Sequence, residues 1–479
     1  MLMKIYKMES KAFFKFIQEL NSRLDFQFYN PEFDKIKNLK NISKYSVIKL
    51  GSEGDNKILL FIAGGTTPKK LPIDSTPEEE RVLFIKNENI KNGELDLTEK
   101  YYIFKSDYEK KLKKKNNQFK YPHIKKGDIL LSMTGTLGNA CLIREDIEAS
   151  INQNVVILRL DKDKIDLEFM NAYLNSKLIK KQIEFLFTSA QTPYLNEDKI
   201  KSLEIVLPDK TIQIKIINKF NLIKSEIIKA IIEQKKLLNE NEDNIPKKFN
   251  INMSDFKPLD YYSCFIEDVN YRLDFVWNNP KLKKIWKILK DKGAIPITNF
   301  ILENIDYGIT DYGIERGETQ FINIENINFD WRINQEGLKF INGVKKEKKL
   351  SEREIIISRS RLVGLTGLIT NKEKGYTFGS YLLRLIPKNK EIPVEYIVNY
   401  FNSKIGRLQT FLLQTGSAGS NINPDQIKQI LILIDDEQEE INRIIKDNFN
   451  KVYELIGEIT KKKEKISELF LGELIKSEI

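Results

Sequence analysis

The chain has 479 residues, a net charge of +10 and a pI near 9.0, and 41% of its residues are hydrophobic and 10% aromatic. This composition excludes a disordered chain and predicts roughly two to four domains. The basic surplus suits a polyanion such as a nucleic acid, a membrane surface being the competing partner. We find neither a run of about 18 apolar residues nor a signal peptide, so we expect a cytoplasmic protein.

Few side chains suit acid–base or metal chemistry. His123 is the sole histidine and lies in the Lys-rich stretch "QFKYPHIKK", where we expect it on the surface. Cys141 and Cys264 are the two cysteines, and we expect both to be reduced core thiols. Neither a usual zinc site nor a Ser–His–Asp or Cys–His catalytic site is therefore expected, although a carboxylate or Mg²⁺ enzyme stays open.

The sequence repeats itself. Five stretches of the first half return in the same order in the second, such as "FIKNENI" (84–90), which returns as "FINIENI" (321–327). The chain therefore consists of two copies of one unit. We expect the stretches that recur to be scaffold. The parts that diverge most, 47–126 and 296–350, are expected to give each copy a different recognition surface.

The two copies divide the chain into five segments. In each copy, short strand patterns and an amphipathic helix precede one long helix, which predicts an α+β globular part followed by that helix. We expect globular parts at 1–210 and 259–436, long helices at 211–243 and 437–479, and a polar linker at 244–258.

Lysines cluster in the first copy ahead of a glycine-rich stretch. Residues 105–126 hold nine Lys against one Asp and one Glu, and aromatic residues lie between them; the second copy has the shorter "NGVKKEKKL" at 342–350. Such clusters neutralise phosphates without reading sequence, a solvated loop being the alternative. The lysines expected to hold DNA are Lys113, Lys114, Lys115, Lys120, Lys345 and Lys346.

The glycine-rich stretch "GDILLSMTGTLGNACLI" (127–143) fits either a phosphate-binding loop or a strand–turn–strand. It lacks the Lys that follows the glycines of a P-loop, and its counterpart "REIIISRSRLVGLTGLI" (353–369) keeps only Gly138, as Gly364. We therefore expect two strands and a turn. The hydroxyl groups that both copies keep either contact a phosphate or cap the turn, and they belong to Ser132, Thr134, Ser358 and Ser360.

Four residues carry side chains suited to reading bases. Arg pairs with guanine, and Gln with adenine, in bidentate geometry. We expect Gln153 and Gln191 in the first copy, and Arg359 and Arg361 in the second, to contact bases. A surface or turn role is the alternative for each of them.

Apolar residues recur in both long helices at alternating steps of four and three, in one register at an offset of 229 residues. This spacing predicts a coiled-coil seam between the two helices, the alternative being two amphipathic helices that each pack on their own globular part. The seam residues are Ile216, Phe220, Ile223, Ile227, Ile445, Phe449, Val452, Ile456 and Ile459.

In combination, these motifs are similar to those of the specificity (S) subunits of type I restriction–modification enzymes and of some type IIB systems. The first copy carries "IAGGTTPKK", "KKGDILLSMTGTLG", "SINQNVVILRL" and "FMNAYLNS". The second carries "DYGIT", "EIIISRSRLVG" and "YIVNYFNS", and it lacks the Gly-Gly-Thr-Thr-Pro turn of the first. Taken in order, the motifs cover nearly the full length.

The resemblance implies two target recognition domains and two antiparallel spacer helices with pseudo-two-fold symmetry. It adds to the DNA-contacting set the residues of "AGGTTPKK", namely Thr66, Thr67, Lys69 and Lys70. It implies a subunit without catalysis or cofactor of its own. Two modification (methyltransferase) subunits would bring S-adenosylmethionine, and restriction/translocase subunits would bring ATP and Mg²⁺.

We therefore expect the chain to recognise a bipartite, asymmetric site in double-stranded DNA and to direct methylation and restriction by partner subunits. An adaptor that binds nucleic acid regardless of sequence, and a DNA-acting enzyme with an unmarked carboxylate site, stay open. The Asn- or Asp-Pro-Pro-aromatic motif of amino-group DNA methyltransferases is missing, since "NNPKL" and "YNPEF" lack the second Pro.

Overall fold

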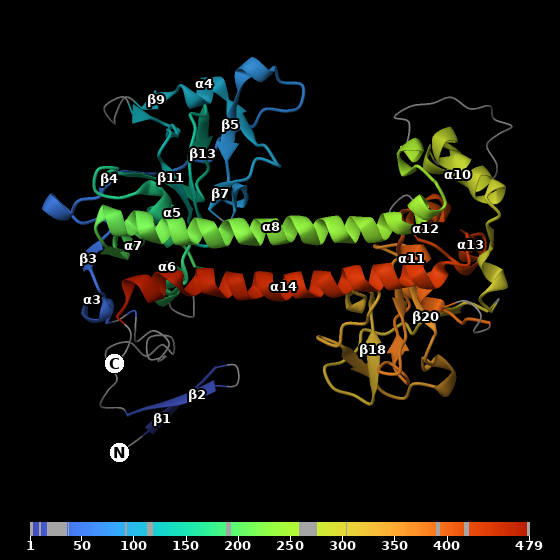
Figure 1. Cartoon of the computed structure of the whole chain (residues 1–479). Helices are drawn as coiled ribbons and strands as arrows, with labels where there is room; N and C mark the ends of the chain where they lie inside the picture. The colour runs from blue at the N-terminus through green and yellow to red at the C-terminus, as the bar shows by residue number, and fades with distance from the viewer. Residues whose placement is uncertain are drawn as a thin grey trace. The chain divides into compact units, whose positions relative to one another are not determined.

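The computed structural model describes residues 3–8, 11–16, 36, 38–91, 93–112, 118–187, 193–257, 275–302, 304–388, 393–415 and 421–476. The chain divides into two compact units, Met1–Ile228 with Ile459–Ile479 and Lys229–Glu458. Both units combine helices and strands, so the predicted mixture of helix and sheet is confirmed (Figure 1).

Two sheets form the centre of the first unit. Their strands are β4 (Leu59–Gly64), β5 (Arg81–Ile85), β8 (Tyr102–Phe104), β11 (Ile129–Ser132), β12 (Ala140–Leu142), β13 (Ala149–Ile151) and β14 (Val155–Leu160). The larger sheet has the antiparallel order β4–β14–β11–β12, and the smaller has the order β8–β5–β13, in which β5 and β13 are parallel. Further strand pairs are β1 (Met3–Met8) with β2 (Lys11–Phe16), β3 (Ser46–Lys49) with β15 (Glu204–Leu207), β6 (Ile90–Lys91) with β7 (Glu94–Leu95), and β9 (Lys111–Leu112) with β10 (Gln118–Phe119).

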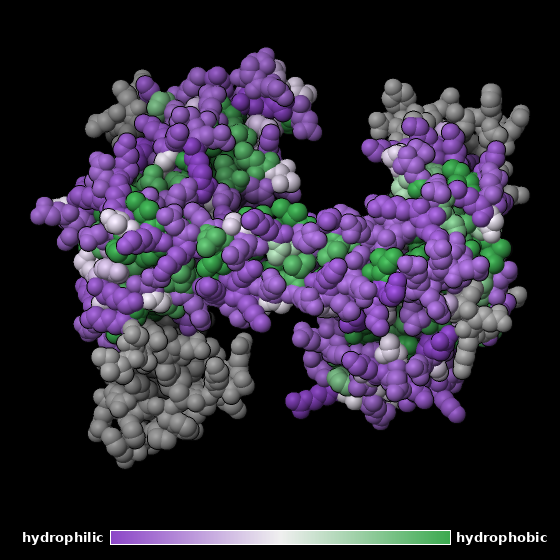
Figure 2. Space-filling model, viewed as in Figure 1, coloured by the Kyte–Doolittle hydropathy of each residue, from purple (hydrophilic) through white to green (hydrophobic). Residues whose placement is uncertain are grey.

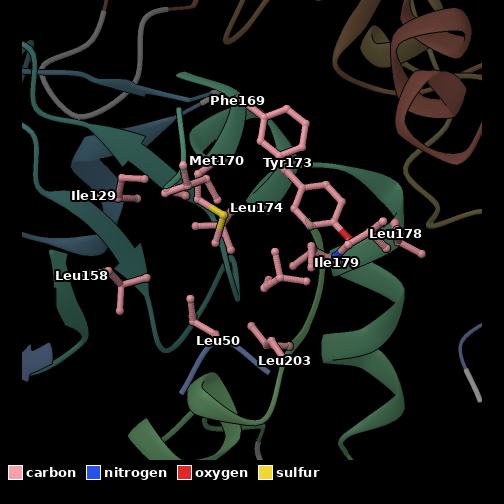
Figure 3. Packing of buried hydrophobic residues seen from close by; sticks show 14 of the residues in the cluster. Leu50, Ile129, Leu158, Phe169, Met170, Tyr173, Leu174, Leu178, Ile179 and Leu203 are labelled. Carbon is pink, nitrogen blue, oxygen red and sulfur yellow. The ribbon is translucent and has the colours of Figure 1, made fainter. Parts of the chain in front are cut away.

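Short helices supply the rest of the first unit's core. They are α3 (Leu39–Ile42), α4 (Lys105–Tyr108), α5 (Leu167–Leu174), α6 (Lys177–Phe185) and α7 (Glu197–Lys201). Phe169 and Tyr173 of α5 are fully buried in one cluster with Ile129 and Leu158 of the larger sheet (Figure 3). Because the residues of β11, β12 and β14 are buried almost without a break, these strands read as continuous apolar runs in the sequence.

The second unit repeats this strand order. Its strands are β16 (Ile295–Pro296), β17 (Asp306–Tyr307), β18 (Thr319–Ile322), β19 (Lys339–Ile341), β20 (Ile355–Ser358), β21 (Thr366–Leu368), β22 (Thr377–Phe378), β23 (Leu382–Leu385) and β24 (Leu431–Ile432). They form sheets in the orders β17–β23–β20–β21, β19–β18–β22 and β16–β24. The helices are α9 (Phe275–Asn278), α10 (Pro280–Asp291), α11 (Val394–Asn402), α12 (Lys404–Leu413) and α13 (Pro424–Lys428).

The glycine-rich stretch is a strand, a turn and a strand, as predicted. In the first unit β11 and β12 pair across the turn, and in the second β20 and β21 do so. Gly138 and Gly364 both have positive φ, +68° and +85°, and a Cβ at Gly138 would lie 2.2 Å from Ile183 Cδ1. This conformation and this close approach explain why both copies keep a glycine here.

Polar residues that recur in both copies bond to the backbone. The Asn175 amide bonds to the N–H and C=O of Ala140 at 3.1 and 3.0 Å, and Asn402 makes the same pair of bonds to Thr366. Gln182 likewise bonds both backbone groups of Glu204, and Gln409 those of Leu431. The expectation that recurring stretches are scaffold agrees with these bonds, which join helices to strands.

The long helices are α8 (Lys210–Lys248) and α14 (Gln438–Leu474). The predicted linker at 244–258 is therefore wrong in its first five residues, which belong to α8. Ile245 is fully buried in the second unit's core, and this burial holds the chain helical through Pro246 and for two residues beyond it. The remaining residues also pack, since Ile251 and Phe256 join the same core.

Within each unit, α8 and α14 run antiparallel, side by side (Figure 1). In the first unit Lys219 pairs with Glu473 at 2.6 Å, and Glu226 pairs with Lys462 at 3.5 Å. In the second unit, Asn448 Nδ2 donates to Asn241 Oδ1 at 2.8 Å. Of the predicted seam residues, Phe220 and Ile456 are half-buried and the following are buried: Ile216, Ile223, Ile227, Ile445, Phe449, Val452 and Ile459.

Candidate nucleic-acid interface

One edge of the larger sheet in the first unit gathers most of the predicted DNA-contacting residues. β4 and β11 end at this edge and β14 begins there, because each runs antiparallel to its neighbour. Backbone bonds join the loops: Gly65 N–H donates to Val155 O at 3.1 Å, and Met133 N–H to Asn154 O at 2.8 Å. The residues that share the edge are Thr66, Thr67, Thr134 and Gln153, of which Thr67 and Gln153 are exposed.

A glycine fixes the loop after β4 in both units. A Cβ at Gly65 would lie 2.0 Å from the carbonyl oxygen of Asn152, and a Cβ at Gly308 would lie 2.2 Å from that of Gly379. Backbone therefore packs against backbone at the same place in each unit. The second copy lacks the Gly-Gly-Thr-Thr-Pro turn, as noted from the sequence, yet it keeps the glycine that this contact requires.

The basic segment adjoins this edge. Thr66 Oγ1 donates to the carbonyl oxygen of Lys120 at 3.4 Å, and a cavity of about 810 Å³ is lined by both residues. Phe61 and Phe119 also line it, as do His123 and Arg159. Lys69 and Lys70 are exposed. Lys113, Lys114, Lys115 and Gln191 lie outside the described residues, as does Cys264.

His123 is not a simple surface residue. Its ring stacks between Tyr108 and Phe119, with centroids 3.8 and 3.7 Å away, and its Nε2 lies 3.0 Å from the carbonyl oxygen of Tyr108. His123 is half-buried and lines the cavity, so it lies at the surface as predicted but is fixed there by its neighbours. The ring holds the aromatic residues of the basic segment together, which a Lys-rich sequence window does not reveal.

The equivalent edge of the second unit carries arginines and tyrosines. The Arg359 guanidinium lies 5.0 Å from the centre of the Tyr307 ring, and Arg359 N–H donates to Tyr381 O at 2.9 Å. Arg359 Nε is buried and has no partner among the described residues. Arg361 is exposed and has a left-handed backbone, with φ +57°. Lys345 and Lys346 are exposed in the loop whose Lys348 bonds to Tyr307 O at 2.9 Å.

The predicted phosphate contact is wrong for two serines. Ser132 and Ser358 are fully buried. Ser132 Oγ donates to Thr136 O and accepts from Asn139 N–H, and Ser358 Oγ donates to Ser360 O at 2.7 Å. Both serines cap their turns, which was the alternative. Ser360, two residues after Ser358 in the second unit, is buried as well. Thr134 is half-buried at the edge, and its contact with a phosphate stays a prediction.

The sequence reading missed the charged pairs beneath each edge. Arg159 makes two 2.7 Å bonds to Asp128, whose side chain is 1% exposed, and Arg384 pairs with Asp306 and Glu354. The signal was present, because a carboxylate and an arginine recur at matching places in the apolar stretches of both copies. Burial raises the pKa of Glu354, and the positive charge of Arg384 partly offsets this rise. Tyr307 and Tyr381, exposed at the second edge, were missed as well.

Neither a metal centre nor a membrane span is found in the part of the chain that the structure describes. No three His, Cys, Asp or Glu side chains of these residues group as metal ligands. None of the helices among them is both long and apolar enough to cross a membrane.

Comparison with known proteins gives both a family and a fold. Residues 59–236 match the family model of the type I restriction modification DNA specificity domain. The S subunit of a type I system from M. genitalium is 14% identical, with 92% of this chain and 98% of that chain covered and a TM-score of 0.42. The HsdS subunit from Thermoanaerobacter tengcongensis is 13% identical, with 90% and 96% covered and a TM-score of 0.37.

A third solved structure comes from work on complex assembly and conformational transition of the type I R-M system. It is 13% identical, with 90% of this chain and 95% of that chain covered, and its TM-score of 0.50 supports a shared fold. No curated protein matches the sequence.

The α+β units, each with a basic or aromatic sheet edge, define a DNA-binding protein. Residues 59–236 are a type I restriction–modification DNA specificity domain, which confirms the resemblance seen in the sequence. The function of this domain is sequence-specific recognition of DNA in a restriction–modification system.

Proposed function

We propose that the whole chain is a specificity subunit that reads a bipartite, asymmetric site in double-stranded DNA. Residues 1–210 and 259–436 would be its two target recognition domains. The helices would form an antiparallel coiled coil that relates the domains by a pseudo-two-fold axis. The observation that carries this proposal is that one sheet edge recurs in both units with different side chains. A shared scaffold with different reading residues suits a site whose halves differ.

Each edge would enter a major groove. Gln153 has the geometry for adenine, and Arg359 and Arg361 have that for guanine, while exposed lysines hold the phosphates. The Arg359 side chain is half-buried at the edge. Tyr307 holds the same guanidinium against its ring, which fixes the direction of the donors.

The helices would set the gap between the half-sites. α8 has 39 residues. At 1.5 Å per residue such a helix is about 58 Å long, which exceeds one turn of DNA, about 34–36 Å. Two domains carried by such helices reach major grooves that are at least a turn apart, and the base pairs between them stay unread.

Catalysis would come from partners. The chain itself would be non-catalytic and without a cofactor, with two modification subunits bringing S-adenosylmethionine and restriction/translocase subunits bringing ATP and Mg²⁺. The exposed residues Ile214, Leu222 and Ile228 support a docking face on α8, since they are 44%, 61% and 47% exposed and lie within about 120° around the helix. Hydrophobic patches interrupt the hydrophilic surface along this helix in Figure 2.

The test is to express the chain with the methyltransferase encoded beside it and to map methylated adenines across the genome. A gapped motif with two different halves is the expected result. DNA binding that ignores sequence, with no motif, would favour an adaptor. Cleavage or modification by the purified chain with Mg²⁺ alone would favour an enzyme, and either result would overturn the proposal.

A further inference from the structure

A chain of ion pairs ties α8 to the globular part of the first unit. Lys224 Nζ lies 2.6 Å from Glu94 Oε1, and Arg144 lies 2.5 Å from the other oxygen of Glu94. Arg144 also makes two bonds to Glu168 of α5, at 2.7 and 2.8 Å. The Lys224 side chain is 34% exposed, so this pair is partly screened from water.

The second unit has a different bond at the same place. Tyr453 of α14 donates from its hydroxyl group to Asp330 Oδ2 at 2.6 Å, and the Asp330 side chain is fully buried. Arg332 pairs with Asp330 at 3.0 Å and lies 5.1 Å from the centre of the Tyr453 ring. The Phe329 ring lies 5.9 Å from the Tyr453 ring.

The two bonds occupy equivalent positions. Lys224 and Tyr453 are separated by the same 229 residues that relate the seam positions of the two helices. Glu94 and Asp330 both follow the stretch that recurs as "NENI" and "IENI". In each unit, therefore, a residue of the long helix holds an acidic side chain just after this recurring stretch, although one bond is an ion pair and the other uses a phenol.

Each bond is a second attachment point along its helix. The first turns of α8 already join the core of the first unit through Ile216, and those of α14 join the core of the second through Ile445. Lys224 and Tyr453 each lie eight residues further along, about 12 Å at 1.5 Å per residue. In the first unit Phe470 and Leu474 of α14 join the same core, beside the first turns of α8. These contacts gather near one end of the helix, and a contact farther along it resists pivoting of the domain about that end.

Glu94 stays charged and Tyr453 stays protonated near neutral pH. Burial opposes the charge of Glu94, but Lys224 and Arg144 outweigh it and hold the pKa of Glu94 below its ordinary value. Burial, and then the bond to Asp330, raise the pKa of Tyr453. Charge-assisted hydrogen bonds of this kind are among the stronger ones in proteins.

We propose that Lys224 and Tyr453 are positioning residues that fix the angle of each recognition domain on its own helix, so that the subunit accepts one gap length between its half-sites. This inference rests on the proposed function, because it concerns how strictly the gap is measured. The two residues would contact neither DNA nor a reacting group.

The test compares gap lengths. The complex of the full chain with its modification subunits is first mapped for its methylated motif, which gives the gap of n base pairs. Wild-type, Lys224→Met and Tyr453→Phe complexes then methylate plasmids that carry the same half-sites at gaps of n − 1, n and n + 1. The matched control is Lys219→Met. Lys219 is on the same helix, but its 2.6 Å ion pair is with Glu473 of α14 and not with the recognition domain.

In Tyr453→Phe, we expect methylation at n − 1 and n + 1, relative to n, to rise about tenfold, the change that the loss of one charge-assisted hydrogen bond to a buried carboxylate produces. In Lys224→Met the rise should be about two- to fivefold, because the side chains of Lys224 and Glu94 are 34% and 46% exposed. Lys219→Met should keep the wild-type ratio, and Lys224→Arg should restore it because Arg still reaches a carboxylate.

The inference is overturned if both variants keep the wild-type ratio, or if a variant with an unchanged melting temperature loses methylation at every gap. Should Lys224→Met fail to fold, Tyr453→Phe, which removes one oxygen atom, decides alone. A wild-type complex without any gapped motif would instead refute the proposed function.

Discussion

The two units share their strand orders and their helix-to-strand hydrogen bonds, and they differ at one sheet edge. The first unit has Gly135 and Gln153 at this edge, and the second has Arg359 and Arg361. Residues such as Gln182 and Gln409 bond to the backbone in the same way in both units. The difference teaches that side chains vary where no backbone group depends on them, which is where a reading surface is able to diverge at small cost to the fold.

The largest effect should come from breaking the scaffold that both units share. Arg384→Met would leave Glu354, 7% exposed, without its cation. We expect a loss of about 3–5 kcal/mol in the free energy of unfolding of the second unit, the usual cost of an unpaired buried charge. Urea unfolding followed by circular dichroism measures it. Arg443→Met, on an exposed pair with Glu440, should cost less than about 1 kcal/mol. Equal losses in the two variants would show that the buried pair is not scaffold.

The next largest effect concerns the reading residues. Arg359→Ala should relax one position of one half-site by about 10- to 100-fold, since a bidentate base contact provides about 1–3 kcal/mol of discrimination. Mapping of methylated adenines in the variant complex measures the change. The half-site read by the first unit should stay as it was. Relaxation of both half-sites would contradict the assignment of one unit to each half.

Much of the scaffold was predictable because the two copies of the repeated unit can be compared within one sequence. Gly138 and Gly364 marked the turn, and the matched registers marked both long helices. Side-chain depth was not predictable, since Ser132 and Ser358 are buried by strands and helices distant in sequence. The end of α8 was missed for the same reason, because burial in the second unit's core outweighs the polar residues around Ile245.

A smaller effect tests the backbone of Arg361. Gly135, its counterpart, has φ +66°, and Arg361 has φ +57°, a region that costs a side chain about 1 kcal/mol or more. Arg361→Gly should therefore raise the free energy of unfolding by about 1 kcal/mol and relax the same half-site as Arg359→Ala. Arg353 has φ +73° at the opposite end of β20. Arg353→Gly should relieve strain without changing the methylated motif, and a changed motif would contradict the role of the edge.

The smallest expected effect is a difference between the two units in how their free energy of unfolding depends on pH. Lys180 and Arg407 occupy the same step of the repeat, each on the helix that follows α5 or α11. Lys180 Nζ donates to Leu137 O at 3.0 Å and Asn139 Oδ1 at 2.7 Å, and burial lowers its pKa from 10.5 to about 8. Burial lowers the pKa of Arg407 too, and Glu242 opposes it, but an arginine keeps its proton at any ordinary pH.

Between pH 8 and pH 10.5 the unfolded chain therefore binds the Lys180 proton and the folded chain releases it. The free energy of unfolding should rise with pH across this window, by at most about 1.4 kcal/mol per pH unit, and the gain should be lost as pH falls through 8. Urea unfolding at pH 7.5, 8.5 and 9.5 measures this slope. Lys180→Arg gives the first unit the residue that the second unit has at this position, and the free energy of unfolding of the variant should depend less on pH. Identical slopes in the wild type and the variant would show that Lys180 keeps its proton.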